Sequence, residues 1–212
     1  LALSEAARTG SARFVEALAQ LRQELSDGEL LQLHSMDCKE ICEEQYYEVI
    51  RRKTASLFAT CAAAGEFFGE YQTAPLFQSH EQEAETHSQA YRLGELIGMI
   101  FQMRDDIFDL TGDAATDKPA GNDLHEGKLT LPVIHAVQCD PTLQPAAMRV
   151  RRGEASAQDI EALTQAAIRT GLPYAQQQMQ CKIDEAHSIA DQIATNPTPL
   201  HTYIDYTANR TI

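Results

Sequence analysis

The sequence predicts an all-α fold, and three observations support this prediction. All eight prolines lie at or after Pro75, so the first 74 residues contain no strong helix breaker. Apolar residues recur at steps of three and four, the spacing that gives a helix one apolar face. No stretch alternates β-branched with polar residues over several positions, so a sheet is not expected. A single all-α domain over residues 1–212 is therefore expected.

Three long helices are expected in the first half of the chain. Residues 11–34 form a helix whose apolar face carries Phe14, Leu18, Leu21 and Leu25. Glu43 and Glu44 suit the first turn of a second helix over about 43–70, because acidic side chains stabilise helix N-termini. Ser79 with Gln82 resembles a capping box that opens a third helix, which ends near Gly112.

Shorter helices are expected after that point. The polar, glycine-containing stretch 113–128 is expected to be a loop, and a short apolar helix follows over 131–139. Pro141 and Pro145 then interrupt the chain. Ser156 with Asp159 caps a helix that runs to about residue 170, and Gly171 with Pro173 separates this helix from the next. The last two helices cover about 174–195 and 200–209.

The charge balance excludes one class of partner. Seventeen Lys and Arg residues against 31 Asp and Glu residues give a net charge of −14, whereas nucleic-acid surfaces need a basic footprint. No nucleic-acid partner is expected. The longest apolar stretches, such as 97–101, are far too short for a transmembrane segment. Five cysteines without paired spacing suit a reducing compartment, so a cytoplasmic location is expected.

The third long helix carries the most informative side chains. Gln102, Asp105, Asp106 and Asp109 follow one another at steps of three and four residues, so all four fall within an arc of roughly 100°. The other faces are apolar, so these carboxylates are expected to face an interior cleft. A hard divalent cation would relieve their mutual repulsion, and all-carboxylate ligation favours Mg²⁺ or Ca²⁺ over zinc. A solvated acidic helix face remains the alternative interpretation.

The loop after this helix adds basic and polar residues. Lys118, Asn122, Asp123 and Lys128 follow within about twenty residues of the aspartates. Lysines at this place can meet the outer oxygens of a phosphate group that a metal ion holds. Lone lysines in loops usually serve solubility, so this cluster is informative only together with the aspartates.

At this point the residues resemble a known family, the trans-isoprenyl diphosphate synthases. The resemblance lies in Asp-Asp-x-x-Asp at 105–109, Gly-Asn-Asp-Leu at 121–124 and Gly-Lys-Leu-Thr-Leu-Pro at 127–132. Gly28, Glu29 and Gln32, together with residues 51–55, resemble upstream helices of the family. The residues of the two later motifs are most similar to those of the long-chain polyprenyl members. The resemblance implies a helical bundle of the isoprenoid synthase type and a homodimer.

The resemblance also implies a Mg²⁺-dependent prenyltransferase. Such an enzyme ionises an allylic diphosphate and condenses it with isopentenyl diphosphate, here toward a long-chain product of the kind found in quinone side chains. Residue by residue, the resemblance implies metal ligation by Asp105, Asp106 and Asp109 and diphosphate binding by Lys53, Lys118 and Lys128. Thr54 and Gln102 match residues beside the developing allylic cation. Asp123 is expected to support the metal ligands and the lysines without binding the metal directly.

One departure from the family matters for activity. The family has an earlier aspartate motif and an isopentenyl diphosphate site before it, and this sequence contains no second Asp-Asp-x-x-Asp. The sequence also starts at Leu1 rather than Met. We therefore expect a carboxy-terminal part of a longer enzyme that lacks its N-terminal helices. A terpene cyclase of the same fold and a non-catalytic partner subunit of a heteromeric prenyl synthase remain alternatives.

Overall fold

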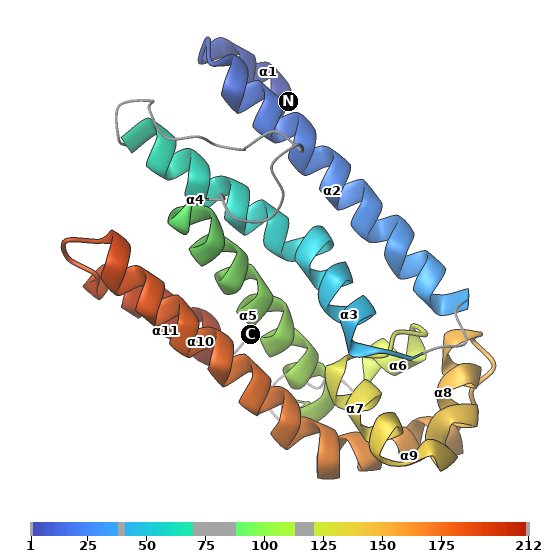
Figure 1. The fold of residues 1–212 in the computed structure, drawn as a ribbon. Coiled ribbons are helices and arrows are strands. Elements are labelled where there is room, and N and C mark those ends of the chain that lie inside the picture. Colours follow the sequence, from blue (N-terminus) through green and yellow to red (C-terminus); the bar gives the residue numbers. More distant parts are fainter. Residues whose placement is uncertain (1, 38–40, 70–87, 113–120, 211–212) are drawn as a thin grey trace. The chain divides into compact units, whose positions relative to one another are not determined.

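The protein is all-α in the part of the chain that the structure describes. The structure is a computed structural model, and it describes residues 2–37, 41–69, 88–112 and 121–210 (Figure 1). Every regular element in these ranges is helical, which confirms the predicted fold class. The α-helices are α1 (Ala2–Arg8), α2 (Ala12–Asp37), α3 (Glu43–Ile50), α4 (Ser56–Gly69), α5 (Gln89–Thr111), α6 (Asn122–His125), α7 (Leu131–Cys139), α8 (Gln144–Arg151), α9 (Ala157–Ala166), α10 (Leu172–Ile193) and α11 (Thr198–Asn209).

Three shorter helical segments connect these α-helices. η2 (Pro141–Leu143) is a single 3₁₀ turn before α8. η1 (Arg51–Ala55) and η3 (Ala167–Gly171) are π-helical turns. η1 joins α3 to α4, and η3 joins α9 to α10, so each π turn lies inside a continuous helical run. Single π turns of this kind occur frequently at functional sites.

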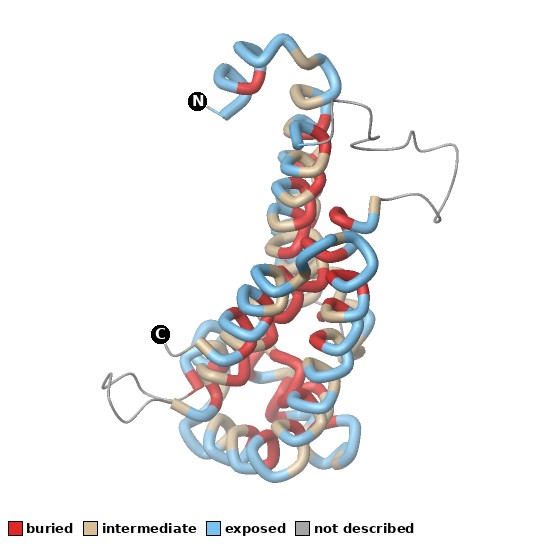
Figure 2. The backbone as a smooth tube through the Cα atoms, turned by 90° about the vertical axis from the view of Figure 1, so that its left-hand side faces the viewer, coloured by how far each residue is buried: buried red, intermediate tan, exposed pale blue. Residues whose placement is uncertain are grey.

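The chain divides into two compact units. The first unit contains Leu1–Glu29, Ile50–Ile100 and Lys182–Ile212, and the second contains Leu30–Val49 and Phe101–Cys181. α2, α5 and α10 therefore each contribute residues to both units. Within each unit, buried residues recur along the helices and alternate with exposed ones, as amphipathic packing requires (Figure 2).

The core of the first unit lies between α2, α4 and the first half of α5. Ala17, Ala59, Phe67 and Tyr91 are buried there, and Phe14 packs against them. Small residues let the helices approach closely. A Cβ atom on Gly98 would lie 2.5 Å from the Cα atom of Ala55, so only glycine permits this spacing.

The core of the second unit gathers short helices around the end of α5. Leu110, Leu124, Val133, Val150 and Leu163, from α5 to α9 in order, belong to one buried cluster. This cluster fixes the segment that follows the aspartates, because α6 contributes Leu124 to it. The polar residues Asn122 and Asp123, which the sequence singled out, thus lie on a helix that is anchored in a packed core.

Several sequence expectations are confirmed. The helix over 131–139 has the expected bounds, with Pro132 in its first turn. The capping box is present, since the Ser156 side chain accepts from the backbone N–H of Asp159 and the Asp159 carboxylate accepts from that of Ser156. The other expected capping box, Ser79 with Gln82, lies outside the described residues.

Three local expectations were wrong. The stretch 113–128 was expected to be a loop throughout, but it contains the four-residue helix α6. Pro145 begins helix α8 rather than interrupting the chain, since the first turn needs no N–H from proline. Gly171 and Pro173 do not separate two helices, because Gly171 closes η3 and α10 starts at the next residue. A Cβ on Gly171 would lie 1.8 Å from the carbonyl oxygen of Pro132, so this glycine serves close packing against α7.

None of the helices that the structure describes combines the length and the apolar character needed to cross a membrane.

We predict that Gly98→Ala lowers the free energy of unfolding by about 2 kcal/mol, because the new Cβ meets the backbone of Ala55. Urea denaturation followed by circular dichroism measures this change. Gly65→Ala is the matched control in α4, where no atom lies within 4 Å of the new Cβ. This control should raise the stability by about 0.5 kcal/mol through helix propensity. Equal stabilities of the two variants would contradict the packing argument.

Candidate functional site

The aspartates that the sequence singled out lie on the last part of α5. The apolar residues of this segment are buried, as Met103, Ile107 and Leu110 are all at most 3% exposed. Asp106 is also buried, at 5% exposed, whereas Asp105 and Asp109 are partly exposed. At Asp106, α5 therefore does not present a solvated acidic face, which was the alternative interpretation of the sequence.

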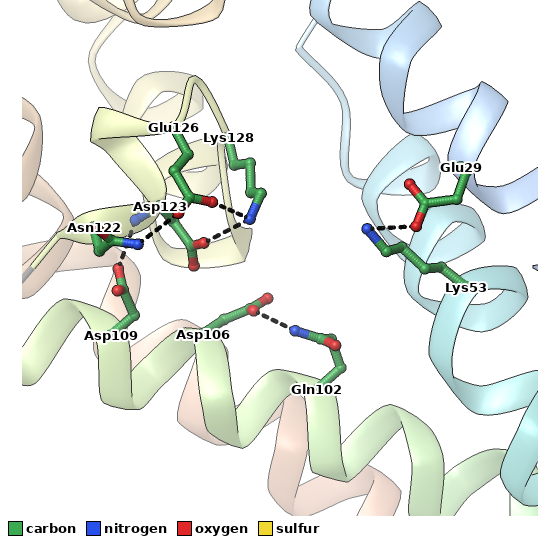
Figure 3. A network of polar contacts seen from close by, with 9 residues as sticks. All are labelled: Glu29, Lys53, Gln102, Asp106, Asp109, Asn122, Asp123, Glu126 and Lys128. Carbon is green, nitrogen blue, oxygen red and sulfur yellow. Dashed lines mark hydrogen bonds and ion pairs between the residues drawn. The ribbon is translucent and has the colours of Figure 1, made fainter.

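Asp106 is held by two neutral donors. The Tyr46 hydroxyl of α3 donates to its Oδ2 at 2.7 Å. The Gln102 side-chain amide donates to its Oδ1 at 2.9 Å (Figure 3). Burial raises the pKa of Asp106 to about 7 despite these two bonds, and the charges of Asp123 and Asp105 add to the effect. Burial and the Asp106 charge likewise hold the pKa of Tyr46 well above 10. Neither neutral donor supplies the positive charge that a buried carboxylate requires.

Asp109 connects α5 to α6. Its Oδ2 accepts from the backbone N–H of Asp123 at 3.1 Å, and its carbonyl oxygen accepts from the N–H of Gly121 at 2.8 Å. Gly121 has φ of 81°, a left-handed conformation that favours glycine and turns the chain into α6. The motif Gly-Asn-Asp-Leu thus brings the Asp123 backbone to the Asp109 carboxylate.

Lys128 lies beside two carboxylates of the same segment. Its Nζ is 3.4 Å from Asp123 Oδ1 and 2.5 Å from Glu126 Oε2 (Figure 3). Glu126 also accepts from the Asn122 amide at 2.8 Å. Burial raises the pKa of Asp123, and the nearby Asp109 raises it further, while Lys128 opposes this shift. The segment therefore places one cation among several carboxylates.

Lys53 and Thr54 belong to the other compact unit, on the π turn η1. The Lys53 ammonium is 3.0 Å from Glu29 Oε1 of α2. Gly28 permits this contact, because a Cβ there would lie 2.8 Å from the Lys53 backbone nitrogen. The adjacent Arg52 pairs with Asp27 at 3.5 Å.

Two ion pairs of these lysines are too exposed to be strong. The side chains of Lys53 and Glu29 are 35% and 57% exposed, and those of Lys128 and Glu126 are 38% and 50% exposed. Exposed ion pairs of this kind contribute about 0 to 1 kcal/mol. A dianionic ligand can therefore displace either carboxylate from its lysine.

The donor set on α5 fits a hard divalent cation. Asp105, Asp106 and Asp109 offer only carboxylate oxygens, which Mg²⁺ and Ca²⁺ prefer. Among the described residues, no three His, Cys, Asp or Glu side chains converge closely enough to chelate a metal ion by themselves. A cation at this place would thus need ligands from water or substrate, as Mg²⁺ commonly does. Lys118 lies outside the described residues.

The sequence did not reveal two partners of the predicted site residues, Tyr46 beside Asp106 and Glu29 beside Lys53. Tyr46 lies sixty residues before Asp106, and nothing local indicates a bond between them. Glu29 was noted only as part of a resemblance, but it is the partner of Lys53.

Comparisons with known proteins indicate the same group of proteins. The sequence model described as polyprenyl synthetase matches residues 1–171. The chain is 35% identical over 129 residues to octaprenyl diphosphate synthase of Escherichia coli, covering 60% of this chain and 36% of that protein. It is 32% identical over 157 residues to geranylgeranyl diphosphate synthase of Methanosarcina mazei, covering 74% of this chain and 43% of that protein. The matched region therefore spans less than half of these relatives.

Solved structures of similar fold agree with this result. Geranylgeranyl pyrophosphate synthase of Bacteroides thetaiotaomicron gives a TM-score of 0.83 at 34% identity, covering 98% of this chain and 67% of that chain. Polyprenyl synthase of Caulobacter crescentus gives 0.80 at 27% identity, covering 96% of this chain and 61% of that chain. The latter structure is a complex with calcium and isoprenyl diphosphate.

We predict that Tyr46→Phe raises the pKa of Asp106 above its value of about 7, because the variant loses a donor that stabilises the carboxylate. A ¹³C NMR titration of the aspartate carboxyl groups measures this pKa. The native pKa exceeds the ordinary 3.8, so the free energy of unfolding should fall as the pH rises from about 4 to about 7. Tyr203→Phe, at an exposed position of α11, is the control. An Asp106 titration that both variants leave unchanged would contradict the predicted hydrogen bond.

Proposed function

Because the chain belongs to the polyprenyl synthetase family, we propose that it carries the diphosphate-ionising half of a prenyltransferase. The reaction extends an allylic diphosphate by condensation with isopentenyl diphosphate. The observation that supports this proposal most strongly is the buried, under-compensated carboxylate group on α5, next to a lysine-bearing segment. The sequences of the motifs at 121–124 and 127–132 favour a long-chain product.

The metal in this proposal is Mg²⁺, held by Asp105 and Asp109, with Asp106 using lone pairs that its two donors leave unused. Bound there, Mg²⁺ would supply positive charge to the diphosphate oxygens and so ease departure of the diphosphate. The calcium and isoprenyl diphosphate of the Caulobacter structure support a divalent cation in this family. The raised pKa of Asp106 also supports it, since this carboxylate is buried and both of its hydrogen-bond donors are neutral.

Lys128, together with Lys118, is proposed to bind the diphosphate. Asp123 holds Lys128 from one side, and its own backbone N–H is fixed by Asp109. When a diphosphate binds, the Lys128 ammonium exchanges the exposed Glu126 for a phosphate oxygen. Asp123 thereby positions the lysine instead of binding substrate itself.

Gln102, Lys53 and Thr54 are proposed to act on the allylic part. Gln102 donates its amide hydrogen to Asp106, which fixes the amide orientation. Its carbonyl oxygen can then direct a partial negative charge toward a developing cation. Lys53 is proposed to bind the diphosphate of the allylic substrate, and Thr54 to lie beside the cation. The π turn that carries both residues is consistent with such a role.

We further propose a homodimer and a cytoplasmic location. The apolar face of α2 predicted from the sequence packs inside the protein, since Phe14 packs in the first core and Leu21 is 7% exposed. Leu30 and Leu33 of α2 are instead 64% and 60% exposed, so they offer apolar surface for a second copy. The free thiols of Cys42, Cys61, Cys139 and Cys181 suit a reducing compartment.

The proposed reaction is tested in the complete protein with Mg²⁺, an allylic diphosphate and radiolabelled isopentenyl diphosphate. We predict that Asp105→Asn lowers turnover at least 100-fold while the helical content is unchanged, because the variant loses a metal ligand and no core packing. The control is Asp184→Asn, at an exposed position of α10. Unchanged turnover of Asp105→Asn would contradict the metal role. A hydrocarbon product would indicate a terpene cyclase, and no consumption of substrate would indicate a non-catalytic subunit.

A second prediction concerns Lys53. Lys53→Ala should weaken binding of an allylic thiodiphosphate to the 212-residue chain by about 10-fold or more, the usual effect of losing one charge-assisted hydrogen bond. Isothermal titration calorimetry in Mg²⁺ measures the dissociation constant. Lys182→Ala makes the same change of charge on α10 and should bind as the wild type does. If both variants bind equally well, Lys53 has no part in diphosphate binding.

A further inference from the structure

A pair of histidines lies in the first unit, on helices that the proposed reaction does not use. His187 of α10 and His201 of α11 stack with ring centroids 4.6 Å apart, and their Nδ1 atoms face each other at hydrogen-bond distance. His187 Nε2 is 3.0 Å from Asp205 Oδ1, and His201 Nε2 is 2.8 Å from Asp191 Oδ1. We call these four residues the histidine pair and its carboxylates. The sequence showed no such pairing, because the two histidines are fourteen residues apart.

The hydrogen bonds determine where the ring protons lie. An ionised carboxylate only accepts hydrogen bonds, so each Nε2 must carry a hydrogen to bond with its aspartate. A neutral imidazole has one N–H, so both Nδ1 atoms then present lone pairs to each other. Two facing lone pairs repel unless a cation lies between them. With the ring hydrogens on both Nε2 atoms, the arrangement is stabilised by a shared proton or by a metal ion between the two Nδ1 atoms.

We propose that the histidine pair binds a divalent transition-metal ion, of which Zn²⁺ is the test case, through the two Nδ1 atoms. A histidine that ligates a metal usually donates its other ring N–H to a carboxylate, and here both histidines do so. Imidazole nitrogen suits zinc, copper and nickel, whereas it is a poor ligand for Mg²⁺. This preference separates the site chemically from the carboxylates of α5.

Charge balance favours the metal ion over the proton. Two aspartates and two neutral histidines with one shared proton carry a net charge of −1, whereas a divalent ion makes the same group neutral. The chain carries a net charge of −14, and its negative field favours a divalent ion over a single proton at this place. Zn–N distances of about 2.0 to 2.1 Å require the two Nδ1 atoms to move apart to about 3.3 Å.

The site is accessible and its remaining positions are open. The side chains of His187 and His201 are 26% and 29% exposed, and both aspartates are 61% exposed, so a hydrated ion can reach the rings. No third protein ligand converges there among the described residues, so water completes the coordination. Bound metal would connect α10 to α11 and stabilise the helical hairpin near the end of the described chain.

Zinc titration of the 212-residue chain in excess Mg²⁺ tests this proposal, with ¹H–¹⁵N spectra of the histidine rings as the readout. The spectra should show one equivalent of Zn²⁺ on Nδ1 of both rings while each Nε2 keeps its hydrogen. His187→Gln should weaken this binding at least 10-fold. At about ten times the dissociation constant, Zn²⁺ should raise the thermal midpoint of the wild type by about 3 °C or more.

The matched control is His34→Gln, at an exposed position of α2, which should bind Zn²⁺ as the wild type does. Asp191→Asn should weaken binding several-fold, because the acceptor of the His201 N–H loses its charge. Ring signals that do not respond to Zn²⁺ would show that the pair shares only a proton, and this would overturn the proposal. Equal Zn²⁺ affinity of His187→Gln and the wild type would overturn it as well. The wild-type spectra decide the question even if a variant fails to fold.

Discussion

The proposed chemistry depends on the electrostatic cost of burying carboxylates on one face of α5. Asp106 lies almost fully inside the protein with two neutral donors, and its pKa of about 7 reflects that cost. Proteins rarely keep such a group without compensation, because an unpaired buried charge costs several kcal/mol. The compensation that fits oxygen ligands is a divalent cation, and the cation in turn accepts a diphosphate. In this account the destabilising interaction in the free protein is the driving force for binding.

The rest of the second unit supports this arrangement. Leu110 and Leu124 belong to one core, so α6 stays close to the end of α5. Asp109 then holds the backbone of Asp123, and Asp123 holds Lys128. Lys128 is also paired with the exposed carboxylate of Glu126, which keeps its ammonium in place at little energetic cost. The same principle applies independently to Lys53 and Glu29 in the first unit.

Local signals in the sequence predicted much of the fold. The helix over 131–139 and the capping box of Ser156 and Asp159 depend on neighbouring residues. The helix was predicted with correct bounds, and the capping box with correct partners. Gly171 shows where local reasoning fails. A glycine followed by Pro173 is typical of a helix end, but the close contact with Pro132 is a tertiary constraint that no local pattern reveals. Likewise α6 has only four residues, too few for a periodic pattern.

The site was predictable in composition but not in contacts. The three aspartates and Gln102 were identified because their spacing puts them on one helix face. The bond from Tyr46 to Asp106 and the pairing of His187 with His201 join residues from different helices, so spacing along the chain carries no trace of them. The sequence predicted an interior position for these carboxylates, but not that Asp106 would be buried while Asp105 stays partly exposed.

The most direct measurement is the affinity of the chain for a non-reactive allylic diphosphate analogue, determined by calorimetry with Mg²⁺ and again with the metal removed by a chelator. If the carboxylates of α5 hold the cation that receives the diphosphate, removing Mg²⁺ should weaken binding at least 10-fold, and the analogue should strengthen Mg²⁺ binding by the same factor. Equal affinity under both conditions would contradict the account, because the diphosphate would then bind without the cation.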